Sequence, residues 1–249
     1  MAGREVVLSE RLKSLADMVC PGKRVVDVGC DHGFLSIYLV QHGISPSVLA
    51  MDVRKGPLSR AQEHIAEYKM ENYIETRLSD GLLEYRIGEA QSLVCAGMGG
   101  RLMMKILTES REKAKTLEEL ILQPQSELPA FRRFLKEEGY LTLEENILCE
   151  EGKFYFLFKV RFAPNEVMEK AGRGDSRQEQ LYEKYGKLLL QGKHPVLKEY
   201  LELMLGMAKQ IERQIADSLQ EGDAGRAQKR LQEVRQELAD VNEALAMLR

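Results

Sequence analysis

The 249-residue sequence contains few cysteines, and they are far apart along the chain. Cys20, Cys30, Cys95 and Cys149 form no C-x-x-C pair, which argues against a zinc site or a disulfide scaffold and predicts reduced thiols. No apolar run is long enough to span a bilayer, and residues 1–12 lack the apolar core of a signal peptide. We therefore expect a cytoplasmic protein with no metal site and no membrane partner.

The sequence also lacks an excess of charge of either sign. Lys and Arg number 36 against 39 Asp and Glu, and the formal net charge is -3. This balance gives no overall indication of nucleic-acid binding, so local groups of cations have to be considered separately. The length is sufficient for one large α/β domain with an extension, or for two modest domains.

The most informative stretch is RVVDVGCDHGFL at residues 24–35. Three valines precede two glycines, and apolar residues then follow at helical spacing, which predicts a strand, a tight turn and a helix. The turn has the pattern Asp27-x-Gly29-x-Asp31-x-Gly33. Glycine at such a turn lets a ligand approach the backbone closely, so we expect a binding site at the carboxyl end of the first strand.

The two acids of this turn distinguish it from a dinucleotide-binding fingerprint. Asp31 lies where a middle glycine is expected, and Asp27 lies inside the strand. Carboxylates at both positions repel a diphosphate and attract an ammonium group. The pattern thus disfavours an NAD-linked oxidoreductase, although a glycine turn without a ligand is common in βα units.

Acids or glycines follow three further predicted strands. Asp52 ends the strand at 47–52, where a carboxylate accepts hydrogen bonds from ribose hydroxyls. Asp80 and Gly81 follow the strand at 73–78, and a glycine-rich segment at 97–100 follows the strand at 92–97. Each feature alone is also explained by ordinary strand ends and helix caps. Together they predict one nucleoside-binding edge of a parallel sheet.

The remaining pattern predicts the fold class and two domains. A fifth strand at 117–124 and a helix at 129–138 precede an antiparallel hairpin with strands at 140–149 and 154–162. Five βα units closed by a hairpin predict an α/β fold with a seven-stranded, doubly wound, Rossmann-like sheet over residues 1–162. Residues 163–249 form the second predicted domain.

The second domain is predicted to be helical. Residues 176–191 have helical character, and two apolar seams then repeat every three and four residues, over 197–215 and 231–248. A glycine-containing loop at 221–225 separates the seams, so we predict an antiparallel coiled-coil hairpin. The hairpin is a candidate both for binding RNA and for weak dimerisation.

Several segments carry a family resemblance. They are LSERL at 8–12, DVGCDHGFL at 27–35, MDVRKGPL at 51–58, SDGL at 79–82, AGMGG at 96–100, LQP at 122–124 and EGKFY at 151–155. Together they resemble the bacterial tRNA (adenine-22-N1)-methyltransferases, which are class I S-adenosylmethionine-dependent methyltransferases. The resemblance implies S-adenosylmethionine as cofactor and N1 of an adenine in the D-arm region of tRNA as acceptor. It covers most of residues 8–162.

Roles for individual residues follow from the resemblance as hypotheses. The expected cofactor-binding residues are Asp27, Gly29, Cys30, Asp31, Gly33, Asp52, Val53, Ser79, Asp80, Gly81, Ala96 and Gly97. His32 and Met98 are the expected catalytic residues beside the acceptor base, although a purely structural His32 is an equal alternative. The expected RNA-binding residues are Arg11, Arg54, Lys55, Arg60, Arg101 and Lys105.

Two other functions remain alternatives. One is a class I methyltransferase that acts on a small molecule or a protein. The other is a non-catalytic RNA-binding protein with a methyltransferase fold. Salt dependence separates the first alternative from a tRNA enzyme, because phosphate contacts make RNA binding sensitive to salt. Binding of S-adenosylmethionine separates the second alternative from an enzyme, because the acidic strand ends of an enzyme are expected to bind this cofactor.

Overall fold

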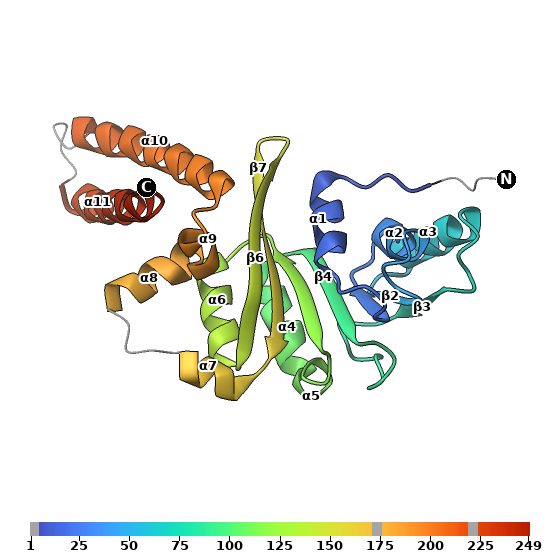
Figure 1. Ribbon diagram of the computed structural model, residues 1–249. Coiled ribbons are helices and arrows are strands. Elements are labelled where there is room, and N and C mark those ends of the chain that lie inside the picture. Colours follow the sequence, from blue (N-terminus) through green and yellow to red (C-terminus); the bar gives the residue numbers. More distant parts are fainter. Residues whose placement is uncertain (1–4, 171–175, 219–223) are drawn as a thin grey trace. The chain divides into compact units, whose positions relative to one another are not determined.

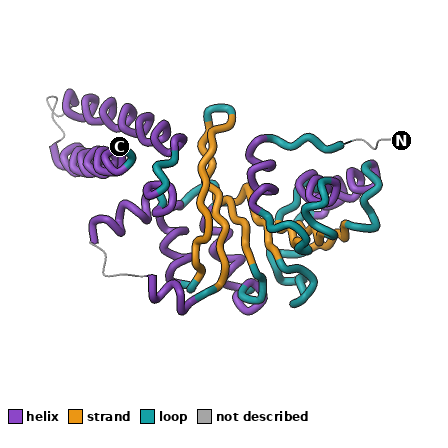
Figure 2. Tube along the Cα trace, viewed as in Figure 1, coloured by secondary structure: helices purple, strands orange, loops and turns teal. Residues whose placement is uncertain are grey.

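The computed structural model describes residues 5–170, 176–218 and 224–249 (Figure 1). The chain divides into two compact units, Met1–Arg173 and Gly174–Arg249. The first unit contains a sheet covered by helices, and the second is helical (Figure 2). The two domains predicted at 1–162 and 163–249 remain a prediction about independent folding, and helix α7 (Pro164–Lys170) falls in the first unit.

The sheet of the first unit has seven strands, as predicted. They are β1 (Val25–Val28), β2 (Val48–Asp52), β3 (Ile74–Leu78), β4 (Ser92–Met98), β5 (Glu119–Pro124), β6 (Tyr140–Glu150) and β7 (Lys153–Phe162). Their order is β3-β2-β1-β4-β5-β7-β6, with β1 to β5 parallel and β7 antiparallel to both of its neighbours. Every residue of β1 is buried, as expected for a central strand covered on both faces.

Helices cover the sheet in two groups. They are α1 (Glu10–Met18), α2 (Phe34–Gln41), α3 (Lys55–Glu67), α4 (Gly100–Glu109), α5 (Arg111–Ala114) and α6 (Leu128–Glu137). Helix α2 contacts α1 and α3, whereas α4 contacts α5 and α6. The chain moves outward from β1 in one direction and from β4 in the other, so right-handed crossovers place the two groups on opposite faces. The point of reversal, between β1 and β4, is where ligands bind in open α/β sheets.

The hairpin at the sheet edge is longer than predicted. Strands β6 and β7 are joined by a turn of only two residues, Glu151 and Gly152, with φ of 51° and 75°. Two positive φ values are typical of a type I′ turn, whose twist matches that of the flanking strands. The pairing therefore extends to Glu150 and Lys153, which the sequence analysis placed in the connection.

The described residues of the second unit form four helices. They are α8 (Ser176–Tyr185), α9 (Lys187–Gln191), α10 (Pro195–Ser218) and α11 (Ala224–Met247). The helical character predicted over 176–191 is confirmed, with one break at Gly186, whose φ of 95° separates α8 from α9. Of the predicted loop at 221–225, residues 221–223 lie outside the described part of the chain, and the last two residues begin α11.

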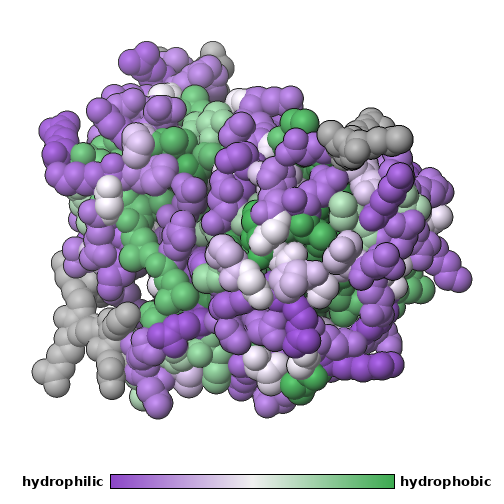
Figure 3. All heavy atoms as spheres, turned by 45° about the vertical axis from the view of Figure 1, so that its right-hand side comes forward, coloured by the Kyte–Doolittle hydropathy of each residue, from purple (hydrophilic) through white to green (hydrophobic). Residues whose placement is uncertain are grey.

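Helices α10 and α11 pack along each other and confirm the predicted helical hairpin (Figure 1). Leu201 and Ala208 of one predicted seam are buried, as are Val234 and Val241 of the other. Dimerisation through this hairpin remains a prediction. In the described residues no helix combines the length and apolarity that a membrane span requires. Hydrophilic residues dominate the face drawn in Figure 3, with hydrophobic residues in patches between them.

A buried acid joins α8 to α11. Asp240 on α11 is 1% exposed, and its carboxylate pairs with Lys184 and with Arg177 at 2.6 Å, both on α8. Burial alone raises the pKa of Asp240, but hydrogen bonds from Lys184, Gln236 and Arg177 outweigh it and lower the pKa below its ordinary value. The stabilisation is therefore present above pH 4 and is lost as the pH falls through the lowered pKa.

Asp240→Asn should lower the free energy of unfolding of the second unit at neutral pH by about 1–2 kcal/mol, because hydrogen bonds to a charged acceptor are stronger than those to an amide. Urea denaturation followed by circular dichroism measures this loss. Glu243→Gln is the matched control, since Glu243 pairs with the same Arg177 but is half-exposed, and its removal should cost less. Equal losses in the two variants would contradict the assigned role.

Candidate functional site

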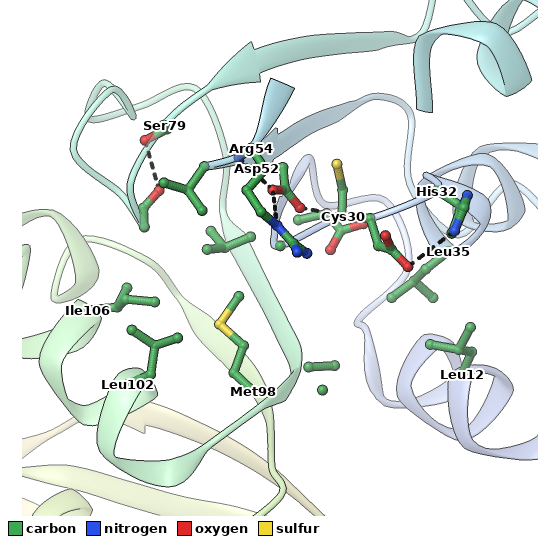
Figure 4. Close-up of a pocket in the computed structure, with 18 of the residues that line it drawn as sticks. Leu12, Cys30, His32, Leu35, Asp52, Arg54, Ser79, Met98, Leu102 and Ile106 are labelled. Atoms are coloured by element: carbon green, nitrogen blue, oxygen red, sulfur yellow. Dashed lines mark hydrogen bonds and ion pairs between the residues drawn. The ribbon is translucent and has the colours of Figure 1, made fainter. Parts of the chain in front are cut away.

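A cavity of about 660 Å³ opens at the carboxyl ends of β1, β2 and β4 and at the turn that follows β3 (Figure 4). Both expected catalytic residues line it, and so do all expected cofactor-binding residues except Gly33. Asp52 of β2 lies across the cavity from Leu102 and Ile106 of α4 (Figure 4), and Asp27 of β1 also lines the cavity. The cavity therefore combines carboxylates with an apolar surface.

The turn after β1 requires its glycines for two different reasons. Gly29 has φ of 77°, and a Cβ there would overlap the terminal methyl group of Met98. Gly33 has φ of 73°, but a Cβ on it would face Ala61 of α3 at 3.1 Å, outside the cavity. Gly29 thus keeps the ligand side of the turn open, whereas Gly33 lets α2 pack closely against α3. Gly33 is not among the residues that line the cavity, and its expected contact with the cofactor stays a prediction.

Asp27 is a buried acid at the base of the cavity. It is 4% exposed, and Ser36 Oγ donates a hydrogen bond of 2.7 Å to its Oδ2. Burial raises the pKa of Asp27 to about 6, and the charge of Asp52 adds to this effect, whereas the hydrogen bond from Ser36 opposes it. A buried carboxylate of this kind is stabilised by a cationic ligand beside it.

Asp52 is held at the end of β2 by backbone amides. Its Oδ1 accepts a hydrogen bond of 2.8 Å from the amide of Arg54, and its Oδ2 accepts one of 3.4 Å from the amide of Asp31. The carboxylate is 5% exposed and lines the cavity (Figure 4). A carboxylate oxygen has two acceptor positions, so each can still accept from a ligand hydroxyl.

The turn after β3 is built by Ser79. Its Oγ donates to the carbonyl of Gly81 at 2.9 Å and accepts from the amide of Glu84 at 3.1 Å. The hydroxyl is therefore engaged in shaping the turn, and Asp80 is exposed at the cavity edge. Of the three predicted residues in this turn, Ser79 positions the other two.

The glycine segment after β4 is anchored by a residue that the sequence analysis missed. Gln123 on β5 is fully buried, and its Oε1 accepts from the amide of Gly97 at 3.2 Å and from Arg11 NH1 at 3.0 Å. Gln123 thereby joins α1 to the segment that contains Met98. The next residue but one, Gln125, lines the cavity. Gln125 directly follows the parallel strand β5, and this position in the sequence could have predicted that it lines the cavity.

The side chain of His32 lies near two other rings, those of Phe34 and His64. Its ring is 6.0 Å from that of Phe34, which stacks on His64 of α3 at 4.4 Å between ring centres. The His32 carbonyl accepts from His64 Nδ1 at 2.9 Å. The side chain of His32 is 40% exposed, with Nε2 3.6 Å from Asp31 Oδ2. His32 is therefore a partly exposed residue at the mouth of the cavity.

The cavity offers no thiolate. Burial and the neighbouring acids Asp27, Asp52 and Asp31 raise the pKa of the Cys30 thiol far above its ordinary value. Burial also raises the pKa of Cys95 to about 12, and Asp27 contributes. Both thiols remain protonated at neutral pH, so neither is a nucleophile here. Within the described residues, no three side chains of the metal-ligating types gather in one place.

The cations expected to bind RNA lie in different places. Arg11 and Arg54 line the cavity, whereas Lys55, Arg60, Arg101 and Lys105 do not. Arg11 is half-buried, and its guanidinium lies over the ring of Tyr155 at 5.4 Å. Together with Gln123, this contact fixes Arg11 at the cavity edge.

Known proteins share this architecture. Residues 8–158 match the model of a methyltransferase domain. A tRNA (adenine(22)-N(1))-methyltransferase of Bacillus subtilis is 34% identical over 151 residues, which cover 61% of this chain and 63% of that protein. The matched stretch therefore spans less than two thirds of the relative.

Solved structures extend the likeness over nearly the whole chain. The crystal structure of the Bacillus subtilis m1A22 tRNA methyltransferase TrmK is 27% identical with a TM-score of 0.81, covering 97% of this chain and 100% of that one. Streptococcus pneumoniae Sp1610 in complex with S-adenosyl-L-methionine is 27% identical with a TM-score of 0.80, covering 96% and 100%. With the family model matching more than half of the sequence, the chain belongs to the methyltransferase domain family.

Proposed function

We propose that this protein transfers a methyl group from S-adenosylmethionine to N1 of adenine 22 in tRNA, in the cytoplasm. The observation that carries the proposal is the meeting of acidic strand ends in one cavity, opposite an apolar wall. The likeness to the Bacillus subtilis enzyme supports adenine N1 as the acceptor. The likeness to a complex with S-adenosyl-L-methionine supports the cofactor.

The residues of the cavity fit this cofactor. Asp27 would bind the ammonium group, because a buried carboxylate with a raised pKa gains from a cation beside it. Asp52 would accept hydrogen bonds from the ribose hydroxyls, and Asp80 from the adenine amine. A diphosphate would be repelled there, because the buried Asp27 and Asp52 place two carboxylates at the strand ends.

The bound cofactor would supply a methyl group carried on a positively charged sulfur. The side chains of the chain then act by positioning, because adenine N1 already has a free lone pair and no proton must be removed from it. Met98 and Gly97 line the cavity together with the acidic strand ends, and a flat base would lie against them. Leu102 and Ile106 would contact its apolar face. N1 is paired in a duplex, so the base must be unpaired or flipped to enter.

Incubation with unmodified tRNA and labelled S-adenosylmethionine, followed by nucleoside analysis, tests the proposal. We expect 1-methyladenosine as the labelled product. Label in another nucleoside, or transfer only to protein or small molecules, would refute the acceptor. Absence of cofactor binding in calorimetry would refute catalysis and leave an RNA-binding protein with a methyltransferase fold.

A further inference from the structure

Cations follow two of the strands that border the cavity, but their surroundings differ. On the α4 side, Arg101 NH2 lies 3.1 Å from Glu127 Oε1, and Lys105 Nζ lies 3.7 Å from Glu109 Oε1. Each positive charge there faces a carboxylate, so the local charge is close to zero. Surface pairs of this kind are weak, but they cancel the field that a distant anion experiences.

The α3 side keeps its positive charge. Lys55 and Arg60 are exposed, and among the described residues no carboxylate pairs with either of them. The side chain of Arg54 is 73% exposed, and Asp52, at 4.0 Å from Nε, is the one acid with which it pairs in the described part of the chain. Asp52 itself is buried inside the cavity. Arg54, which precedes α3 and lines the cavity, and Lys55 and Arg60, in the first two turns of α3, therefore form a group of exposed cations at the start of this helix.

Helix α3 carries its cations before its acids, as α4 does, but the cations of α3 have no carboxylate partner among the described residues. Its first turn contains no acid, and no side chain caps its first amides. Exposed Glu63 and Glu67 follow the cations, towards the other end. A helix macrodipole favours the reverse order, with acids first and cations last. Asp52 accepts from the amide of Arg54 at the start of α3, and a further anion there would be favoured by the exposed cations and by the helix dipole.

We propose that the RNA strand entering the cavity passes over the start of α3, with its phosphates on Lys55 and Arg60, and does not follow α4. This inference rests on the proposed function, because it assumes that the polyanion is the tRNA substrate. Arg54 lines the cavity and belongs to the same group of cations, so it marks the point where the strand turns inward. The phosphates remain outside the acidic cavity, and only the base enters it.

Two double variants with the same change in charge test the path. They are Lys55→Gln/Arg60→Gln on α3 and Arg101→Gln/Lys105→Gln on α4. Binding of fluorescently labelled tRNA is measured by anisotropy without cofactor, over a series of KCl concentrations. The α3 variant should weaken binding at low salt by about tenfold or more, and reduce the slope of log Kd against log salt by roughly 1.4–1.8. The α4 variant should stay within about twofold of the wild type, because its cations are already neutralised.

The outcomes separate this inference from the proposed function. Calorimetry with S-adenosylmethionine should give wild-type affinity in both variants, since none of the four residues lines the cavity. A larger loss in the α4 variant, equal losses, or no tRNA binding by the wild type would overturn the path. If the wild type forms no 1-methyladenosine but the α3 variant alone loses RNA affinity, the acceptor is wrong and the path stands.

Discussion

Asp52→Ala is expected to lower the affinity for S-adenosylmethionine by at least about 100-fold. Two ribose hydroxyls donating to one carboxylate give hydrogen bonds of about 1.5–3 kcal/mol each, and about 1.4 kcal/mol corresponds to a factor of ten. The substitution also removes the acceptor that holds the amides of Arg54 and Asp31, so the turn around the ligand loosens. Titration calorimetry of the purified variant measures the loss.

S-adenosylhomocysteine makes this experiment more specific. It shares the ribose but lacks the methyl group and the charge on sulfur, so Asp52→Ala should weaken both ligands by the same factor. Glu63→Ala is the matched control, because it removes one exposed carboxylate of α3 outside the cavity. Its affinity should stay within about twofold of the wild type. An Asp52→Ala variant that remains folded and binds both ligands normally would exclude Asp52 as the ribose acceptor.

Local sequence pattern was sufficient to predict much of the fold and the cavity. Buried strands such as β1 and β4 are mostly apolar, and parallel strands end at a shared edge. Acids near the carboxyl ends of neighbouring parallel strands are therefore expected to converge, and Asp27 of β1 and Asp52 of β2 do line one cavity. The seven-stranded sheet followed from the same alternation of strands and helices, closed by the hairpin.

Contacts between distant residues were beyond prediction from pattern. Gln123 and Arg11 are 112 positions apart, and no periodicity relates them. The break between α8 and α9 depends on the conformation of Gly186, which apolar spacing does not reveal. The pairing of Arg101 with Glu127 likewise depends on how the chain turns after β5. Composition alone made the cations of α3 and α4 equivalent, and only their neighbours distinguish them.

Two buried acids at opposite ends of the sheet have pKa values shifted in opposite directions. Asp27 lies at the carboxyl end of β1, and burial raises its pKa to about 6. Glu119 begins β5 at the opposite end, where hydrogen bonds from Cys20 and Ser92 and the charge of Lys159 outweigh burial and lower its pKa. Glu119 is stabilised by the fold as a carboxylate. Asp27 is destabilised as one, and we infer that its compensating partner is the ligand.

Because the pKa of Asp27 is raised in the folded protein, the free energy of unfolding should decrease as the pH rises. Between its ordinary pKa of 3.8 and about 6, the folded protein holds a proton that the unfolded chain has released. The contribution of this group to stability is therefore largest below pH 4 and falls by about 3 kcal/mol as the pH rises above 6. Asp27→Asn should remove this term, which urea denaturation of wild type and variant over the same pH range measures as a difference.

Asp27→Asn should relieve the loss of stability above pH 6 but weaken the binding of S-adenosylmethionine. A cationic ammonium needs the ionised carboxylate, so wild-type affinity for S-adenosylmethionine should rise about tenfold per pH unit below pH 6 and level off above it. Asp27→Asn should bind about 100-fold more weakly at pH 7, with no such rise, because an amide does not compensate the ammonium charge. Glu119→Gln is the matched control: it should lower the free energy of unfolding and leave the affinity unchanged, since Glu119 is at the other end of the sheet. An affinity of wild-type protein that does not vary between pH 5 and 7 would show that Asp27 is not the partner of the ammonium group, because its ionisation is the only step in this range that the binding model requires.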